Sequence, residues 1–166
     1  MKEKYFKKFK YIKQSNNAKS VSFYMTKNNP HFSRELYKQM KKILKKRDDK
    51  FRISLHSSTQ SKLHNMVIGL KKGDIFPPHK HKKDEAYQIV YGKLALVTFN
   101  KKGKIKKKII LSLNESLIAK IEKNTYHGIV ALTDVIYHEI RLGPFISKTD
   151  STFPSWSVEF KGNKIV

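Results

Sequence analysis

The sequence predicts an all-β fold with a short N-terminal helix, in which mostly antiparallel strands close into a sandwich or barrel. From residue 51 onward, apolar and polar residues alternate with a period of two, which is typical of half-buried strands. These segments are short, and turns rich in Gly, Asn, Asp or Lys separate them without an intervening helix. A hydrophobic fraction of 39% in 166 residues, with ten Phe and eight Tyr, is enough for a folded core.

The chain before residue 51 divides into an arm and a helix. Residues 1–30 mix Lys, Asn, Ser and aromatic residues without steady periodicity, so we expect a basic arm with one short strand around VSFYM (21–25). Residues 31–50 carry apolar side chains at helical spacing and end in basic residues, where the helix dipole favours them. Ser33 is the expected N-cap, with Asn29 and Pro30 as an alternative start. The helix is expected to pack on the barrel.

Residues 51–166 are expected to form this barrel and a C-terminal tail. In FRISLH (51–56), Phe51 and Ile53 share one face, and Arg52 and His56 share the other. Further strands are expected within KLHNMVIGL (62–70), AYQIVYGKLALVTF (86–99), IKKKIILSL (105–113), SLIAKIE (116–122), YHGIVAL (126–132) and VIYHEIRL (135–142). The tail from residue 143 is irregular, but its aromatic residues indicate that it packs on the barrel.

Composition restricts the functions that remain open. The net charge is +23, from 36 Lys+Arg against 13 Asp+Glu, and lysine runs such as KKGKIKKK (101–108) are typical of solvated loops and strand ends. Two interpretations stay open: a merely basic surface, or a patch that attracts phosphates or anionic lipid. A small anionic or sugar ligand fits either interpretation. The sequence contains no nucleic-acid recognition motif, so specific nucleic-acid binding is not expected.

Other absences are also informative. The sequence has no cysteine, so a metal must be bound by histidines or carboxylates. The sequence contains no run of apolar residues long enough to span a membrane, and it starts without the apolar segment of a secretory signal. We therefore expect a cytoplasmic protein with no membrane span.

The stretch FPPHKHKKDEAYQIVYG (76–92) is the strongest candidate for a metal site. In an extended chain, His79 and His81 point to the same side, so their imidazoles can share one ion. Glu85 opens the next strand, and its carboxylate can return toward the same centre. His127 precedes an apolar strand in IEKNTYHGIV, from which a neighbouring hairpin could bring a further imidazole. The alternative is a chance His-x-His sequence in a solvated loop.

The remaining histidines have simpler interpretations. His31, at the entry to the helix, is expected on the surface. His64 alternates with Met66 and Ile68, and His138 shares a face with Ile136 and Ile140. Both are expected to be hydrogen-bonded histidines of the core rather than metal ligands.

The spacing of Gly73, His79, His81, Glu85 and Gly92 resembles the first motif of the cupin superfamily at all five positions. Of the second cupin motif, usually Pro-x-Gly-x-x-His, the segment EKNTYH (122–127) keeps only the histidine. Asn124 stands where glycine is usual, and asparagine tolerates the left-handed conformation of a turn. The resemblance implies a cupin-type antiparallel β-barrel, or jelly roll. It also implies one divalent transition metal bound by His79, His81, Glu85 and His127, with zinc, iron, manganese, nickel and cobalt all open.

From about residue 34 to 160 the chain also resembles the WbuC family of cupin-fold metalloproteins. The similarity rests on the order of an N-terminal helix, RISLHSS, VIGLKKGDIFPPHKH, YHGIVAL, HEIRLGPF and FPSWSVEF. Members of that family occur with bacterial surface-polysaccharide genes for O-antigen and capsule. The resemblance therefore implies action on a sugar or nucleotide sugar in lipopolysaccharide or capsule biosynthesis. A sugar isomerase or epimerase is one interpretation, and a non-catalytic, metal-bound binding or regulatory cupin is the other.

Residues around the expected metal provide further candidates. Arg52 and Arg141 are the candidate binding groups for an anionic substrate, because the guanidinium offers a planar fork. For both, a structural ion pair, for example with Glu139, is the alternative. Tyr87, Tyr126 and His56 are candidate acid–base groups, and for both tyrosines packing in the pocket wall is the alternative. A homodimer is expected.

Overall fold

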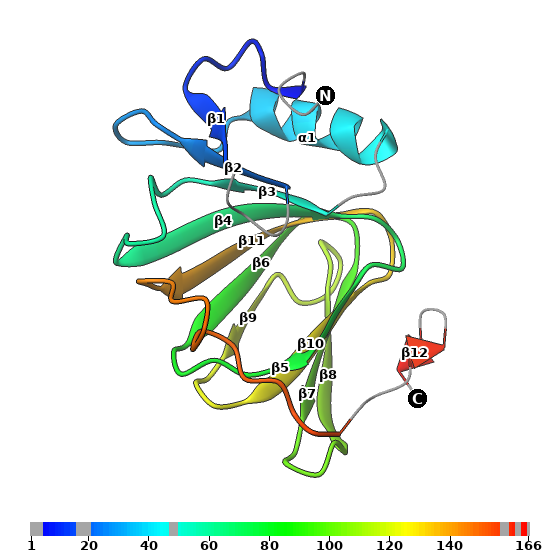
Figure 1. Cartoon of the computed structure of the whole chain (residues 1–166). Coiled ribbons are helices and arrows are strands. Elements are labelled where there is room, and N and C mark those ends of the chain that lie inside the picture. The colour runs from blue at the N-terminus through cyan, green and yellow to red at the C-terminus, as the bar shows by residue number, and fades with distance from the viewer. Residues whose placement is uncertain (1–4, 16–20, 47–49, 157–159, 162–163, 166) are drawn as a thin grey trace.

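The computed structural model describes residues 5–15, 21–46, 50–156, 160–161 and 164–165, and it confirms a mostly β fold in which two sheets face each other (Figure 1). The larger sheet has the strand order β1 (Ile12–Gln14), β2 (Val21–Met25), β3 (Phe51–Ser54), β4 (Leu63–Leu70), β11 (Val135–Leu142), β6 (Glu85–Tyr91) and β9 (Ile118–Ile121). The smaller sheet has the order β5 (Ile75–His79), β10 (Tyr126–Ala131), β7 (Leu94–Phe99) and β8 (Ile105–Leu111). Neighbouring strands are antiparallel, except that β2 runs parallel to β3.

The inner faces of the two sheets form the barrel core. Because side chains alternate along a strand, β4 turns Met66, Ile68 and Leu70 inward. Leu94 and Leu96 of β7 join the same cluster from the smaller sheet. The expected strand positions are confirmed within a few residues.

The outer face of the larger sheet is covered by the N-terminal part of the chain. Helix α1 (Arg34–Lys46) buries Leu36, Met40, Ile43 and Leu44 against Phe51, Ile53 and Val67. Each fully buried side chain of this size stabilises the fold by roughly 1.5–3 kcal/mol. Figure 1 shows α1 on the side of β2 and β3 that faces away from the smaller sheet.

The helix begins as expected, since the backbone N–H of Leu36 donates to Oγ of Ser33 at 3.2 Å. Within the described residues, α1 is too short and too polar to cross a membrane.

The arm is more regular than the sequence indicates. The expected strand around VSFYM is β2, and the additional strand β1 pairs with it from Ile12 to Gln14. Three residues are too few to show an alternating pattern, which is why β1 escapes sequence analysis. Residues 1–4 and 16–20 of the expected arm lie outside the described part of the chain.

The tail returns to the smaller sheet and pairs with the chain directly after β5. The backbones of Lys80 and Thr152 exchange two hydrogen bonds of 3.0 and 2.9 Å. Trp156 packs against Phe99 and Tyr126, with ring centroids 5.4 and 5.5 Å away. The expected packing of aromatic tail residues on the barrel is therefore confirmed for Trp156.

We call residues 150–153 the strap. Beyond it, β12 (Phe160–Lys161) and β13 (Lys164–Ile165) form a two-stranded pair, and residues 157–159 of the expected closing segment lie outside the described chain.

Candidate metal centre

Three histidines converge at one end of the smaller sheet. His79 ends β5, and His127, the second residue of β10, lies directly opposite it in the register. His81 follows two residues after His79. One ring nitrogen from each lies within 4.8 Å of the others, and His81 and His127 are buried while His79 is half-buried. Chain segments far apart in sequence thus bring together three imidazoles at a spacing that one metal ion can bridge.

Each of these imidazoles is oriented by a backbone carbonyl. Nδ1 of His79 lies 2.8 Å from the carbonyl oxygen of Pro77, and Nδ1 of His127 lies 2.9 Å from that of Thr125. Nδ1 of His81 lies 2.6 Å from the carbonyl oxygen of Asp150 in the strap. A carbonyl only accepts, so in each ring Nδ1 donates a proton to it, which leaves Nε2 as the nitrogen that could bind a metal. Ligating histidines in metalloproteins are oriented by partners of this kind.

Glu85, the first residue of β6, adds a carboxylate to the histidines. Its Oε1 lies 2.6 Å from Nε2 of His127, and its Oε2 lies 3.6 Å from Nε2 of His81. Both oxygens are buried, and the nearest ring nitrogens to them are those of His127 and His81. Burial of a carboxylate carries a desolvation cost, which a neighbouring positive charge offsets. The three histidines alone form the group whose ligand atoms all lie within 4.8 Å among the described residues, and they could hold a metal ion; Glu85 borders this group without belonging to it.

The pKa shifts follow from the same contacts. Burial, together with the neighbouring His127, lowers the pKa of His79 to about 4, so this imidazole is neutral at physiological pH. Burial alone would lower the pKa of His127, but its contact with Glu85 outweighs burial and raises it. Burial alone would raise the pKa of Glu85, but His127 and the charge of His81 outweigh burial and lower it. The carboxylate is therefore ionised, as a ligand must be.

The turns around the site have the conformations that the motif requires. Gly73 and Gly92 have φ angles of 87° and 82°, and a Cβ on Gly92 would lie 2.2 Å from the carbonyl oxygen of Asp134. Asn124 has a φ of 62°, so the asparagine adopts the left-handed conformation expected where glycine is usual. Its N–H donates to the carbonyl oxygen of His81 at 2.7 Å, which ties the turn before His127 to the first pair of histidines.

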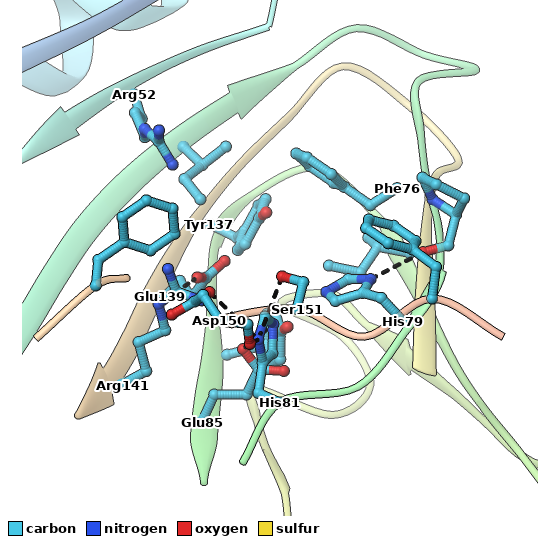
Figure 2. A pocket seen from close by; sticks show the side chains of 16 residues that line it. Arg52, Phe76, His79, His81, Glu85, Tyr137, Glu139, Arg141, Asp150 and Ser151 are labelled. Atoms are coloured by element: carbon cyan, nitrogen blue, oxygen red, sulfur yellow. Dashed lines mark hydrogen bonds and ion pairs between the residues drawn. The ribbon is translucent and has the colours of Figure 1, made fainter. Parts of the chain in front are cut away.

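A pocket of about 250 Å³ opens beside the histidines (Figure 2). His79, His81 and Glu85 contribute to its lining, together with inward-facing residues of β3, β4, β6, β10 and β11 and with the strap. Its other lining residues are Arg52, Ile68, Phe76, Pro77, Tyr87, Ile129, Tyr137, Glu139, Arg141, Phe145, Asp150, Ser151 and Phe153.

Both predicted anion-binding arginines reach this pocket, but their surroundings differ. Nη1 of Arg141 donates to Oδ2 of Asp150 at 2.8 Å, and its Nε lies 4.0 Å from Oε1 of Glu139. Arg141 therefore forms the structural ion pair with Glu139 that was the alternative to anion binding. It also forms an ion pair with Asp150 in the strap. Arg52 donates from Nε to Oγ of Ser22 at 2.8 Å.

The three acid–base candidates lie in different places. Tyr87 lines the pocket, with its hydroxyl 3.3 Å from Nε2 of His127. Tyr126 does not line it, because His127 faces inward and the preceding residue of the strand must face outward, where Tyr126 packs on Trp156. His56 does not line it either; its ring stacks on that of His64 with centroids 4.2 Å apart.

His31 and His64 match their simpler interpretations, whereas His138 is hydrogen-bonded as expected but only half-buried. His31 is exposed, as expected. His64 is buried, and its Nε2 lies 3.2 Å from the carbonyl oxygen of Thr59. His138 is half-buried and contacts Oδ1 of Asn65 through Nε2.

Several lining residues of the pocket are not among the predicted site residues. Tyr137 and Glu139 alternate with Arg141 along β11, so period-two spacing could have placed all three on the inner face. Asp150 contacts both Arg141 and His81, yet it lies in the irregular strap, where no periodicity indicates the direction of a side chain. Phe145 and Phe153 lie in the same irregular part of the chain.

Comparisons with known proteins place the fold. A family model described as a domain of unknown function (DUF6016) matches residues 33–111, and no curated protein matches. CapF, a capsular polysaccharide assembling protein from Staphylococcus aureus, is similar with a TM-score of 0.54 and 19% identity, over 65% of this chain and 30% of CapF. A structural-genomics protein from Shewanella oneidensis is similar with a TM-score of 0.51 and 14% identity, over 63% of this chain and 73% of that one.

A cupin superfamily protein from Desulfitobacterium hafniense has a TM-score of 0.48 and 15% identity, over 57% of this chain and 78% of that one. The two facing sheets form a cupin-type jelly-roll fold with an added N-terminal helix, and three of its histidines are placed where they could hold a metal ion.

Proposed function

We propose that this protein is a WbuC-type cupin that binds one divalent transition metal through His79, His81, Glu85 and His127. Its pocket then acts on a sugar or nucleotide sugar in bacterial surface-polysaccharide biosynthesis. The observation that carries the metal site is the shared orientation of the three imidazoles, each of which donates its Nδ1–H to a backbone carbonyl, while one ring nitrogen of each lies within 4.8 Å of the others.

The residues of the chain have distinct roles in this proposal. A divalent ion bound here would supply a Lewis acid that polarises a carbonyl or hydroxyl oxygen of the ligand. The carbonyls of Pro77, Thr125 and Asp150 fix the imidazole rings before any ion arrives, so little reorganisation is needed on binding. The partly buried Phe76 gives the pocket an apolar wall. Arg52 and Arg141 provide positive charge for an anionic group.

The polysaccharide context is supported by the order of motifs shared with the WbuC family. CapF, with which the chain shares a fold, is a capsular polysaccharide assembling protein, and that setting agrees with the proposal. The cytoplasmic address and the homodimer remain predictions from the sequence.

A non-catalytic binding or regulatory role is the second candidate, and one observation favours it. Tyr87 is the tyrosine whose hydroxyl contacts the histidine cluster, and burial together with the charge of Glu85 raises its pKa well above the ordinary value. Tyr87 is therefore protonated at physiological pH and cannot serve there as a base. A protein that binds a sugar at the metal without converting it would need no base.

Elemental analysis of the purified protein tests the metal site. We expect about one equivalent of a transition metal in the wild type and its loss in a His79→Ala/His127→Ala double variant, with folding checked by circular dichroism. His31→Ala, which removes an exposed histidine, is the matched control and should keep the metal. A wild type that stays metal-free after reconstitution with zinc, iron, manganese, nickel and cobalt would overturn the proposal.

The catalytic part is tested with the metal-loaded protein. Incubation with sugars and nucleotide sugars, followed by NMR of the sugar protons, should reveal an isomer that the double variant does not produce. If candidate sugars raise the melting temperature but remain unchanged, the binding role is the correct one.

A further inference from the structure

Arg52 lines the pocket with a guanidinium group, and only part of its hydrogen-bond donors have partners among the described residues. Its Nε donates a hydrogen bond to Oγ of Ser22, which fixes the plane of the guanidinium. Within the described residues, no hydrogen bond or ion pair is formed by either of its Nη nitrogens. In Figure 2 the side chain points from β3 toward the pocket. A fixed guanidinium with open donors suits a planar, charged acceptor that can bind both nitrogens at once.

Tyr137 supplies a second unused donor in the same pocket. Its side chain is fully buried, and its hydroxyl has no hydrogen-bond partner among the described residues. An unsatisfied buried hydroxyl costs roughly 1–3 kcal/mol, which a ligand acceptor would offset. Tyr137 lies on β11, and the neighbouring strand β4 separates it from β3, which carries Arg52. The two side chains therefore approach the pocket from the same inner face of the larger sheet.

Arg141 differs from Arg52 because its guanidinium already forms ion pairs with carboxylates of the protein. Asp150 and Glu139 both lie beside it, so an incoming anion would have to displace a carboxylate. The two arginines named by the sequence are thus not equivalent, and Arg52 is the one available to a ligand.

The surroundings favour a carboxylate over a phosphate. Asp150 lines the same pocket, and its negative charge repels a dianion more strongly than a monoanion. Ile68, which pairs with Arg52 across β3 and β4, is apolar and supplies no side-chain donor of the kind that phosphate oxygens require.

The size of the pocket restricts the ligand further. Pockets for drug-sized ligands usually measure roughly 300–1,000 Å³. At about 250 Å³, this pocket encloses a molecule of about monosaccharide size, and the nucleotide part of a nucleotide sugar would extend beyond it.

We propose that the pocket binds a sugar acid of monosaccharide size, with its carboxylate on Arg52 and Tyr137 and its hydroxyl groups toward the histidines. This inference rests on the proposed function in taking the pocket as a sugar site. The carboxylate contact itself does not depend on the metal, so the two can fail separately.

The test measures dissociation constants by isothermal titration calorimetry for D-glucuronate, D-gluconate, D-glucose and glucose 6-phosphate. At least one of the two sugar acids should bind the wild type at least about tenfold more tightly than D-glucose does. Arg52→Gln should remove this preference, and Tyr137→Phe should weaken acid binding by about threefold or more. Arg34→Gln, which removes an exposed arginine of α1, should leave all constants unchanged.

Each contrary result identifies what failed. Equal affinity for D-glucose and both acids, or no binding of any probe, would overturn the carboxylate site, as would an unchanged preference in Arg52→Gln. Tighter binding of glucose 6-phosphate than of either acid would make it a phosphate site instead. Metal content is measured on the same samples and should be equal in wild type and Arg52→Gln. A metal-free wild type that still prefers a sugar acid would overturn the metal proposal and leave this inference standing.

Discussion

His79 and His127 lie directly opposite each other on the antiparallel strands β5 and β10, and this pairing sets the position of the candidate metal centre. Opposite residues of such a pair have Cβ atoms about 4.5–5.5 Å apart and share one face of the sheet. The register shifts between His127 and Ile129, so a bulge accompanies the histidine pair, as is common beside functional sites. The ring centroids of the pair are 4.5 Å apart, close enough to share one ion.

Replacing Glu85 tests whether a carboxylate completes the histidine cluster. Glu85→Gln removes the charge but keeps the shape, so we expect the affinity for Zn²⁺ or Co²⁺ to fall at least about tenfold, measured by competition with a chelator. Glu122→Gln, at an exposed position in the turn before His127, is the control and should bind like the wild type. Unchanged affinity in Glu85→Gln would mean that the three histidines bind the ion without the carboxylate.

Asp150 should influence the metal through His81. Its backbone carbonyl accepts the Nδ1–H of His81, and its carboxylate holds the strap against Arg141. Asp150→Ala frees the strap, so His81 loses its fixed orientation and the metal affinity should fall by about tenfold, within the range typical of such outer partners. The same chelator competition measures the change.

Thr149→Ala, at an exposed residue beside the strap, is the matched control and should leave the affinity unchanged. If Asp150→Ala also behaves like the wild type, the strap does not orient His81.

Asn124 allows a test of backbone conformation. Its φ of 62° is accessible to glycine and asparagine but costs other residues roughly 1–2 kcal/mol. Asn124→Gly should therefore keep the free energy of unfolding near the wild-type value, whereas Asn124→Ala should lower it by about 1 kcal/mol. Urea unfolding followed by circular dichroism measures both. Equal stability of the two variants would show that the turn relaxes to a right-handed conformation.

Much of the fold and of the histidine cluster could be predicted from the sequence because strand periodicity and ligand spacing are local properties. The pattern from Gly73 to Gly92 places His79, His81 and Glu85 within one strand–turn–strand unit, which the structure reproduces. The contribution of His127 depends on strand pairing between distant segments, and the sequence supported it only through the resemblance and the turn before β10.

Other features depend on tertiary contacts that leave no local pattern. Asp150 reaches His81 because the strap pairs with Lys80, and nothing in its own neighbourhood indicates this. Arg52 and Arg141 look equivalent in the sequence, and they differ only because Asp150 and Glu139 lie beside one of them. Tyr126 could have been placed outside the pocket, since it precedes an inward-facing histidine in a strand.

His56 makes the stability of the fold depend on pH. Burial, with the neighbouring His64, lowers the pKa of His56 from 6.5 to about 4, and the N–H of Asn65 donates to its Nδ1 at 3.0 Å, which requires a neutral ring. Between these two values the unfolded chain binds a proton at His56 and the folded chain does not. The contribution of His56 to the free energy of unfolding is therefore complete above pH 6.5 and decreases as the pH falls toward 4.

Urea unfolding at pH 7 and at pH 4.5 should reveal this contribution as a difference between the wild type and His56→Gln. The amide of glutamine can accept the same N–H but does not titrate. We therefore expect the wild type to lose about 2 kcal/mol more stability than the variant between the two pH values. Removing an exposed histidine, as in His31→Gln, should leave the wild-type pH dependence intact. Parallel pH profiles for wild type and His56→Gln would mean that His56 becomes protonated in the folded protein at its ordinary pKa.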